Sequence, residues 1–355
     1  MNQDSGTWLV SSPVPTAEAM LKEHDVRDSA ASGESIQVIH HERNPGCAFD
    51  LGWVESVHVN RSAVERRTAT LTTRRTVKKD WQAAWLLRAI QCMDLTTLSG
   101  DDTPGNVHRL CAKARQPVRH DLLIALGVPK GALHTAAVCV YHHFVADAVA
   151  ALRGSGVPVA AVSTGFPAGL VSHEVKLRQI ADSIAAGAAE IDIVISRHLV
   201  LTGDWRGLYD EVRSFREACG DAHIKTILAT GELATLTNVA RASLVCMMAG
   251  ADFIKTSTGK EPVNATLPVS LVMVRAIRDF NERTRGVIGF KPAGGIRTAR
   301  QATDWLALIK DELGDAWLSP DLFRFGASSL LGDIERQLEH HVTGAYSASF
   351  RHPMA

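Results

Sequence analysis

A short apolar stretch that ends in a glycine turn decides the fold: Asp252-Phe253-Ile254-Lys255-Thr256-Ser257-Thr258-Gly259-Lys260. If it forms a strand, Phe253, Lys255 and Ser257 share one face, because successive side chains of a strand point to opposite sides. An ammonium group within a buried strand is costly, so packing alone explains Lys255 poorly. The alternative is that Lys255 forms a structural ion pair with a neighbouring carboxylate, or that its side chain extends out of the end of the strand.

A second stretch has the same arrangement: Val287-Ile288-Gly289-Phe290-Lys291-Pro292-Ala293-Gly294-Gly295. It is again a short apolar strand with a lysine near its end and a glycine-rich turn after it. An amine attacks a carbonyl only when it is unprotonated, and a nearby cation together with partial desolvation lowers its pKa. Two such lysines on successive strands therefore favour catalysis by an amine, with Lys255 as the nucleophile and Lys291 as the cation that lowers its pKa.

Short strands and helical segments alternate from residue 89 onward. This alternation predicts parallel strands joined by right-handed crossovers, and about eight such units in roughly 250 residues is the size of a single (β/α)8 TIM barrel. The alternative fold is a doubly wound open sheet, but the glycine-rich dinucleotide fingerprint after its first strand is missing. The predicted strands are residues 90–95, 136–141, 159–163, 190–195, 224–229, 252–257, 287–291 and 323–327.

The segments outside the barrel are less regular. Residues 1–47 are rich in Ser, Gly, Pro and charge, which predicts a poorly structured N-terminal extension. Residues 48–88 are predicted to be a pre-barrel helical segment, residues 89–345 the catalytic barrel and residues 346–355 a C-terminal tail. The pre-barrel segment contains the basic run Arg74-Arg75-Thr76-Val77-Lys78-Lys79, interpreted as a solvated helix face or, alternatively, as a nucleic-acid contact.

The composition narrows the class of protein. Lys and Arg together number 38, as do Asp and Glu, so the formal net charge of zero argues against a general nucleic-acid binder. The six cysteines lie far apart with no CxxC pair, which is typical of reduced core thiols. The sequence shows neither a signal peptide at its start nor a run of about 18 apolar residues. We therefore expect a soluble, cytoplasmic protein.

In a TIM barrel the active site lies at the C-terminal ends of the strands. Asp192, in Glu190-Ile191-Asp192-Ile193-Val194-Ile195, would point into the barrel and could accept a proton directly or through water. Its alternative role is that of a counter-ion to a lysine. This chemistry needs no metal and no other cofactor. The loops after the last three strands are expected to bind a phosphate. The phosphate-binding candidates are Gly259, Lys260, Gly294, Gly295, Arg297, Gly326, Ser328 and Ser329.

Six motifs point to a known family. They are residues 93–98 (MDLTTL), 190–192 (EID), 230–233 (TGEL), 253–260 (FIKTSTGK), 289–297 (GFKPAGGIR) and 325–330 (FGASSL). In this order they resemble the deoxyribose-phosphate aldolase family, whose members are class I, Schiff-base aldolases. FIKTSTGK together with GFKPAGG is highly specific for that family.

The resemblance implies reversible cleavage of 2-deoxy-D-ribose 5-phosphate to acetaldehyde and D-glyceraldehyde 3-phosphate, in deoxyribonucleotide catabolism. It implies that Lys255 is the Schiff-base lysine, with Lys291 beside it and Asp192 moving protons through water. It also implies substrate contacts at Asp94 and Cys139, although Cys139 is equally well explained as a core thiol.

The chain departs from the shorter bacterial members at two points. Those members end in a tyrosine that closes over the site, whereas this chain ends His352-Pro353-Met354-Ala355, and its nearest candidate is Tyr346. Ala229 stands where the short members have a glutamate. Both features resemble the longer-chain branch of the family, whose members also carry a pre-barrel segment.

Three rival functions remain open from the sequence. Another Schiff-base enzyme, such as a transaldolase-like or ketose-phosphate aldolase, would need polar groups for extra hydroxyls. A metal-dependent aldolase is less favoured, because His142-His143 and His340-His341 lack ligand spacing. The non-enzyme alternative is a nucleic-acid-associated protein that uses the basic run at residues 74–79. The expected partners are a sugar phosphate and aldehydes, and the sequence leaves open whether the chain forms a homo-oligomer.

Overall fold

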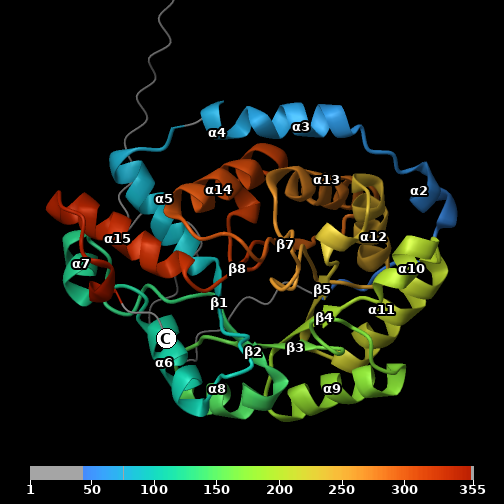
Figure 1. Ribbon diagram of the computed structural model, residues 1–355, viewed down its shortest axis with the longest axis horizontal. Coiled ribbons are helices and arrows are strands. Elements are labelled where there is room, and N and C mark those ends of the chain that lie inside the picture. Colours follow the sequence, from blue (N-terminus) through green and yellow to red (C-terminus); the bar gives the residue numbers. More distant parts are fainter. Residues whose placement is uncertain (1–42, 75, 353–355) are drawn as a thin grey trace, which may run out of the picture.

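Eight parallel strands form the centre of the molecule, and helices surround them (Figure 1). The structure, a computed structural model, describes residues 43–74 and 76–352. In chain order the strands are β1 (Met93–Thr96), β2 (Ala137–Tyr141), β3 (Val159–Ser163), β4 (Glu190–Val194), β5 (His223–Ile227), β6 (Phe253–Lys255), β7 (Gly289–Lys291) and β8 (Phe325–Ala327).

The strands close into a barrel. They pair in the order β7-β6-β5-β4-β3-β2-β1-β8. The two ends of that order meet through isolated bridges, Phe290 with Phe323 and Ala293 with Gly326. The predicted single (β/α)8 barrel is therefore confirmed. The first strand begins later than predicted, at Met93, because the residues before it complete the preceding helix.

The helices cover the outside of the barrel and bury one face each. Helix α11, for example, buries Leu208, Val212 and Phe215, whose spacing of four and three residues lines one helix face. Side-chain caps fix where helices begin, as at Thr298, which forms a capping box with Gln301. The helices that follow the first strand are α6 (Pro104–Arg115), α7 (His120–Ala125), α8 (Val145–Ala151), α9 (His173–Ala185), α10 (Arg197–Thr202), α11 (Trp205–Cys219), α12 (Leu236–Met248), α13 (Leu267–Thr284), α14 (Ala299–Leu313) and α15 (Leu330–Thr343).

The pre-barrel segment forms four helices. Of these, α3 and α4 lie across the outside of α13 and α14 (Figure 1). Arg75 lies outside the described residues, as does the side chain of Arg74, so only part of the basic run is seen; Lys78 and Lys79 are exposed. Among the described residues, none of the helices is long and apolar enough to cross a membrane. The four helices are α2 (Leu51–Ser56), α3 (Arg61–Ala69), α4 (Leu71–Arg74) and α5 (Lys79–Gln91).

The chain just before these helices is bonded to the base of the barrel. The buried Asn44 donates from its side chain to the carbonyls of Met247 and Ala251, and its backbone N–H donates to Asp252. The part of the expected extension that the structure describes is thus tied to the residues that precede β6. Residues 1–42 lie outside the described part, and the domain boundaries stay a prediction.

Candidate active site

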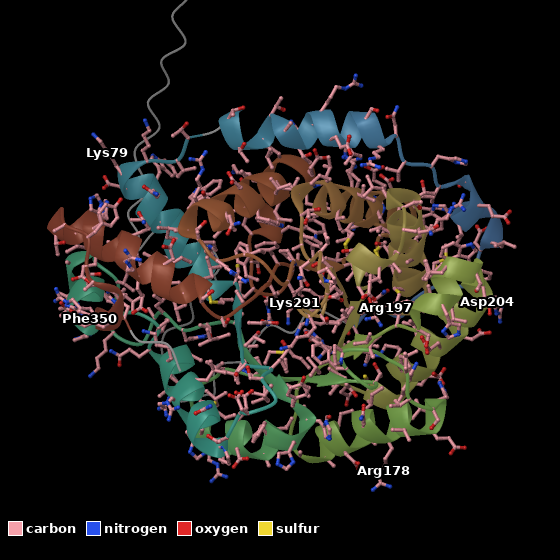
Figure 2. The ribbon with its side chains drawn as sticks, viewed as in Figure 1. Lys79, Arg178, Arg197, Asp204, Lys291 and Phe350 are labelled. Carbon is pink, nitrogen blue, oxygen red and sulfur yellow. The ribbon has the colours of Figure 1, made fainter. Side chains whose placement is uncertain are left out.

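Two lysines from neighbouring strands meet inside the barrel. Lys255 on β6 is paired in register with Lys291 on β7. Both ammonium nitrogens donate to the same oxygen, Oδ2 of Asp192 on β4, each at 2.7 Å. Figure 2 shows Lys291 in the middle of the ring of strands, whereas Arg178 and Asp204 lie at the periphery. The structure therefore brings together the three residues that the sequence predicts to be catalytic.

These three residues belong to a larger buried set, here called the interior array. Lys225 on β5 lies 3.4 Å from Asp192 and 3.5 Å from Asp94, and it also pairs with Glu190. Arg324, just before β8, donates to both Asp94 and Glu190. None of the seven residues is more than 4% exposed. The members of the interior array are Asp94, Glu190, Asp192, Lys225, Lys255, Lys291 and Arg324.

The pKa values of the two predicted catalytic lysines shift in opposite directions. Burial lowers the pKa of Lys255 and Lys291 lowers it further; although Asp192 opposes this, the pKa falls below its ordinary value. Burial also disfavours the charged form of Lys291, but Asp192 and Asp94 outweigh it, so the pKa of Lys291 rises. Asp192 has a pKa well below its usual range, because the neighbouring lysines outweigh the effect of burial. Lys255 is thus the lysine that loses its proton more easily.

The charges of the interior array indicate that one of its basic groups is uncharged, which agrees with this assignment. The array contains three carboxylates and four basic groups, all closed off from solvent. A net charge inside a barrel of low polarity is unfavourable. The array is neutral when one basic group has lost its proton. Arg324 cannot do so at ordinary pH, and of the three lysines only Lys255 has a lowered pKa.

A phenylalanine and a glycine form the floor below this array. The ring of Phe253 lies 5.9 Å from the ammonium of Lys225 and 5.8 Å from the guanidinium of Arg324. Gly289 is paired with Phe253 across β6 and β7, and a Cβ at Gly289 would lie 2.3 Å from a ring carbon. Only glycine leaves room for this ring, which supports the strand that carries Lys255.

The predicted phosphate-binding turns lie next to one another at the ends of β6, β7 and β8. A Cβ on Gly259 would be 4.0 Å from the Cα of Gly294, and the backbone of Gly294 bonds to that of Gly326. Gly295 has φ +83° and open space on its Cβ side. The polar side chains expected to bind the phosphate are all exposed, and two of them directly precede α15. These side chains belong to Lys260, Arg297, Ser328 and Ser329.

The two other predicted substrate contacts, Asp94 and Cys139, are fully buried. Asp94 accepts from Lys291 at 2.5 Å and from Arg324 at 2.6 Å, so its contacts are with cations of the interior array. Cys139 packs with Ala160 and Val162 on the β2–β3 side of the barrel, and burial raises the pKa of its thiol. Direct substrate contact by either residue stays a prediction.

Sequence reasoning missed Lys225 and Arg324. Lys225 carries the same signal as the other two lysines, a cation between the apolar residues Ile224 and Ile227 of a short strand. Arg324 has a similar signal between Phe323 and Phe325.

The tyrosine nearest the C-terminus, Tyr346, is exposed and its ring stacks on His340 at 4.0 Å. It follows the C-terminal end of α15, a helix that begins after β8 and so runs away from the ends of the strands where the phosphate-binding turns lie. The last three residues lie outside the described part.

Comparison with known proteins identifies the family of this chain. The family model described as DeoC/LacD family aldolase matches residues 88–333. A deoxyribose-phosphate aldolase from Mus musculus is 62% identical over 87% of this chain and 98% of its own length. One from Homo sapiens is 60% identical over 88% of this chain and 99% of its own. A solved deoxyribose-phosphate aldolase from Aeropyrum pernix, described as tetrameric, shares the fold with a TM-score of 0.55 and 21% identity, covering 79% of this chain and 99% of that one. From the family match and the two mammalian relatives, the chain belongs to the DeoC/LacD family of aldolases.

Proposed function

We propose that the protein is a class I aldolase that reversibly cleaves 2-deoxy-D-ribose 5-phosphate to acetaldehyde and D-glyceraldehyde 3-phosphate. Relatives that carry the name deoxyribose-phosphate aldolase match nearly their whole length at about 60% identity, which supports this substrate. The observation that carries the mechanism is the shared oxygen of Asp192, bound at 2.7 Å by both Lys255 and Lys291.

The reaction begins at Lys255. Its neutral amine attacks the C1 aldehyde of the open-chain sugar, and the adduct takes up one proton and loses water to give a protonated imine. A free lysine with a pKa of about 10.4 offers on the order of one neutral amine in a thousand at pH 7. Lowering that pKa to about 7 is worth roughly 4 to 5 kcal/mol. Burial and the neighbouring Lys291 act in this direction.

Asp192 serves the carbon–carbon cleavage. The protonated imine withdraws the electron pair of the C2–C3 bond, which leaves an enamine on the two-carbon fragment. The C3 hydroxyl must give up its proton, and Asp192 accepts it directly or through one water. D-Glyceraldehyde 3-phosphate then leaves, C2 is protonated, and hydrolysis of the imine releases acetaldehyde and restores Lys255.

Two parts of the barrel fit the two ends of this substrate. The exposed side chains of Lys260, Arg297 and Ser328 follow the glycine turns at the ends of β6 to β8 and would hold the phosphate. A largely apolar cluster around Cys139 and Val162 lines the β2–β3 side of the barrel. A sugar with an extra hydroxyl at C2 would leave that group without a partner at this wall, which disfavours ribose 5-phosphate.

Trapping of the imine tests the proposal. Borohydride added in the presence of acetaldehyde should leave a stable two-carbon adduct on Lys255, found by peptide mapping. Lys255→Met should abolish the adduct, whereas a surface control, Lys310→Met, should keep it. Labelling of Lys291 in place of Lys255 would reverse the roles of the two lysines. Cleavage of ribose 5-phosphate or fructose phosphates at the same rate as deoxyribose 5-phosphate would contradict the proposal that deoxyribose 5-phosphate is the substrate.

Two further expectations accompany this function. The relative from Aeropyrum pernix is described as a tetramer, which favours a homo-oligomer here and can be checked by sedimentation. The cytoplasmic location expected from the sequence stays a prediction.

A further inference from the structure

Arg324 joins two carboxylates at the base of the interior array. Its Nη1 donates to Oδ1 of Asp94 at 2.6 Å, and its Nη2 donates to Oε1 of Glu190 at 2.9 Å. Its Nε donates to the backbone carbonyl of Pro320. The residue is 4% exposed. A guanidinium stays protonated in proteins, so Arg324 is a fixed positive charge in this position.

Glu190 is the matching negative charge at the base. It accepts from Lys225 and Arg324 and is 3% exposed. Lys225 connects Glu190 to Asp192, because its ammonium also lies 3.4 Å from Oδ1 of Asp192. The other oxygen of Asp192 binds Lys255. A continuous chain of alternating charges thus runs from Glu190 and Arg324 to the reacting amine, although neither residue touches that amine.

The charge count of the interior array explains how Arg324 and Glu190 would affect the protonation of Lys255. With Lys255 neutral, three carboxylates face three cations in a space closed to solvent. Removing the positive charge of Arg324 would leave an excess negative charge, which a proton on Lys255 would cancel. Removing the negative charge of Glu190 would leave an excess positive charge, which would make a proton on Lys255 still less favourable.

We propose that Arg324 and Glu190 are positioning residues of the aldol reaction, which fix the charge balance of the barrel interior so that Lys255 remains an uncharged nucleophile. The proposal rests on the proposed function, because it takes Lys255 as the Schiff-base lysine.

Other charged and titratable groups pack against this array and must be kept unchanged in a test. His223 on β5 lies 3.9 Å from Glu190 and is the titratable group at the base. Below it, Asp252 pairs with Arg216. The remaining groups that face the array are the thiol of Cys139 near Lys255, the thiol of Cys92 near Arg324, the carboxylate of Asp321 near Cys92, and the guanidinium of Arg43 near Glu190.

The test compares the pH dependence of imine trapping in four variants. Arg324→Gln should move the acid limb of the trapping rate on Lys255 to higher pH, and Glu190→Gln should move it to lower pH. Each shift should be roughly one pH unit, which is the effect of a unit charge over about 10 Å at an effective dielectric constant of about 20. At a pH below the limb, such a shift changes the trapping rate about tenfold. The double variant should return close to the original limb, and the conservative Arg324→Lys should stay near it. A change of position of His223 alone would not give shifts of opposite sign.

Shifts in the same direction, or no shift in folded variants, would overturn the inference, because a merely structural role lowers rates without reversing sign. If Arg324→Gln does not fold, Glu190→Gln alone still decides: its acid limb must move to lower pH, whereas a merely structural role would lower the rate without moving the limb. Failure of the proposed function looks different. In that case the unaltered protein itself would give no adduct on Lys255.

Discussion

Replacing Lys291 by methionine tests the electrostatic basis of the proposed mechanism. The two lysine nitrogens bind one oxygen at 2.7 Å each, so they are no more than twice that distance apart. At about 5 Å and an effective dielectric constant of about 20, two unit charges repel by about 3 kcal/mol, which corresponds to about two pKa units. Without Lys291, Lys255 no longer shares the Oδ2 atom of Asp192 with a second ammonium group. The contact with this carboxylate also favours the charged form of Lys255.

The expected result is a higher pKa for Lys255 in Lys291→Met. Because the neutral amine then exists only at higher pH, the acid limb of imine formation should move up by about two pH units. At neutral pH the trapping rate on Lys255 should fall about 100-fold and recover in alkaline buffer.

The assay is borohydride trapping with acetaldehyde over a range of pH, with the adduct measured on the peptide that contains Lys255. Lys291→Arg keeps the positive charge and should retain the original limb, and circular dichroism checks that each variant is folded. A limb that stays at its original pH while the rate falls equally at every pH would refute the reasoning. Lys291 would then act through geometry and not through its charge.

Three further predictions concern the phosphate, the barrel floor and acid stability. Arg297→Ala should raise KM for deoxyribose 5-phosphate at least several-fold and leave cleavage of unphosphorylated deoxyribose unchanged, as measured by steady-state kinetics. Gly289→Ala should lower the free energy of unfolding in urea by about 1–3 kcal/mol, because the new Cβ would lie 2.3 Å from the ring of Phe253; an unchanged midpoint would contradict the packing. Asp94 and Asp192 have folded-state pKa values below their ordinary values, so their stabilisation is full above about pH 4 and is lost as the pH falls further. Acid titration of Asp192→Asn should show a smaller loss of stability over that range.

The meeting of the two lysines could be predicted from the sequence. The alternation of side chains along a strand determines which face each lysine lies on, and the parallel order of the strands determines which strands are neighbours. Lys255 and Lys291 end successive strands, so adjacent strands in a barrel must bring them together. The ends of the same strands place the glycine turns side by side for the same reason. Contacts between distant parts of the chain could not be predicted in this way. Asn44 bonds to Asp252 across 208 residues, and no local pattern indicates that pairing.

The residues missed by sequence reasoning belong to the same class of contact. Arg324 meets Asp94 through the pairing of β8 with β1, but it meets Glu190 on β4 only across the interior of the barrel. Strand alternation predicts that a side chain points inward, but the tilt and stagger of the closed barrel decide which inward side chains touch. A charge pattern in the sequence therefore predicted that Lys255 and Lys291 meet and left their ionic partners below them unidentified.

The opposite pKa shifts of Lys255 and Lys291 follow from the number of carboxylates that each lysine contacts. Lys291 binds both Asp94 and Asp192, whereas Lys255 binds Asp192 alone. Each carboxylate contact favours the protonated amine, so in a shared buried environment the lysine with one contact releases its proton first. An exchange of contacts would exchange the roles. Asp94→Asn removes one contact from Lys291 and should therefore bring the two lysines closer in pKa, with borohydride labelling spreading from Lys255 to Lys291; labelling confined to Lys255 would show that counting carboxylates is not what separates them.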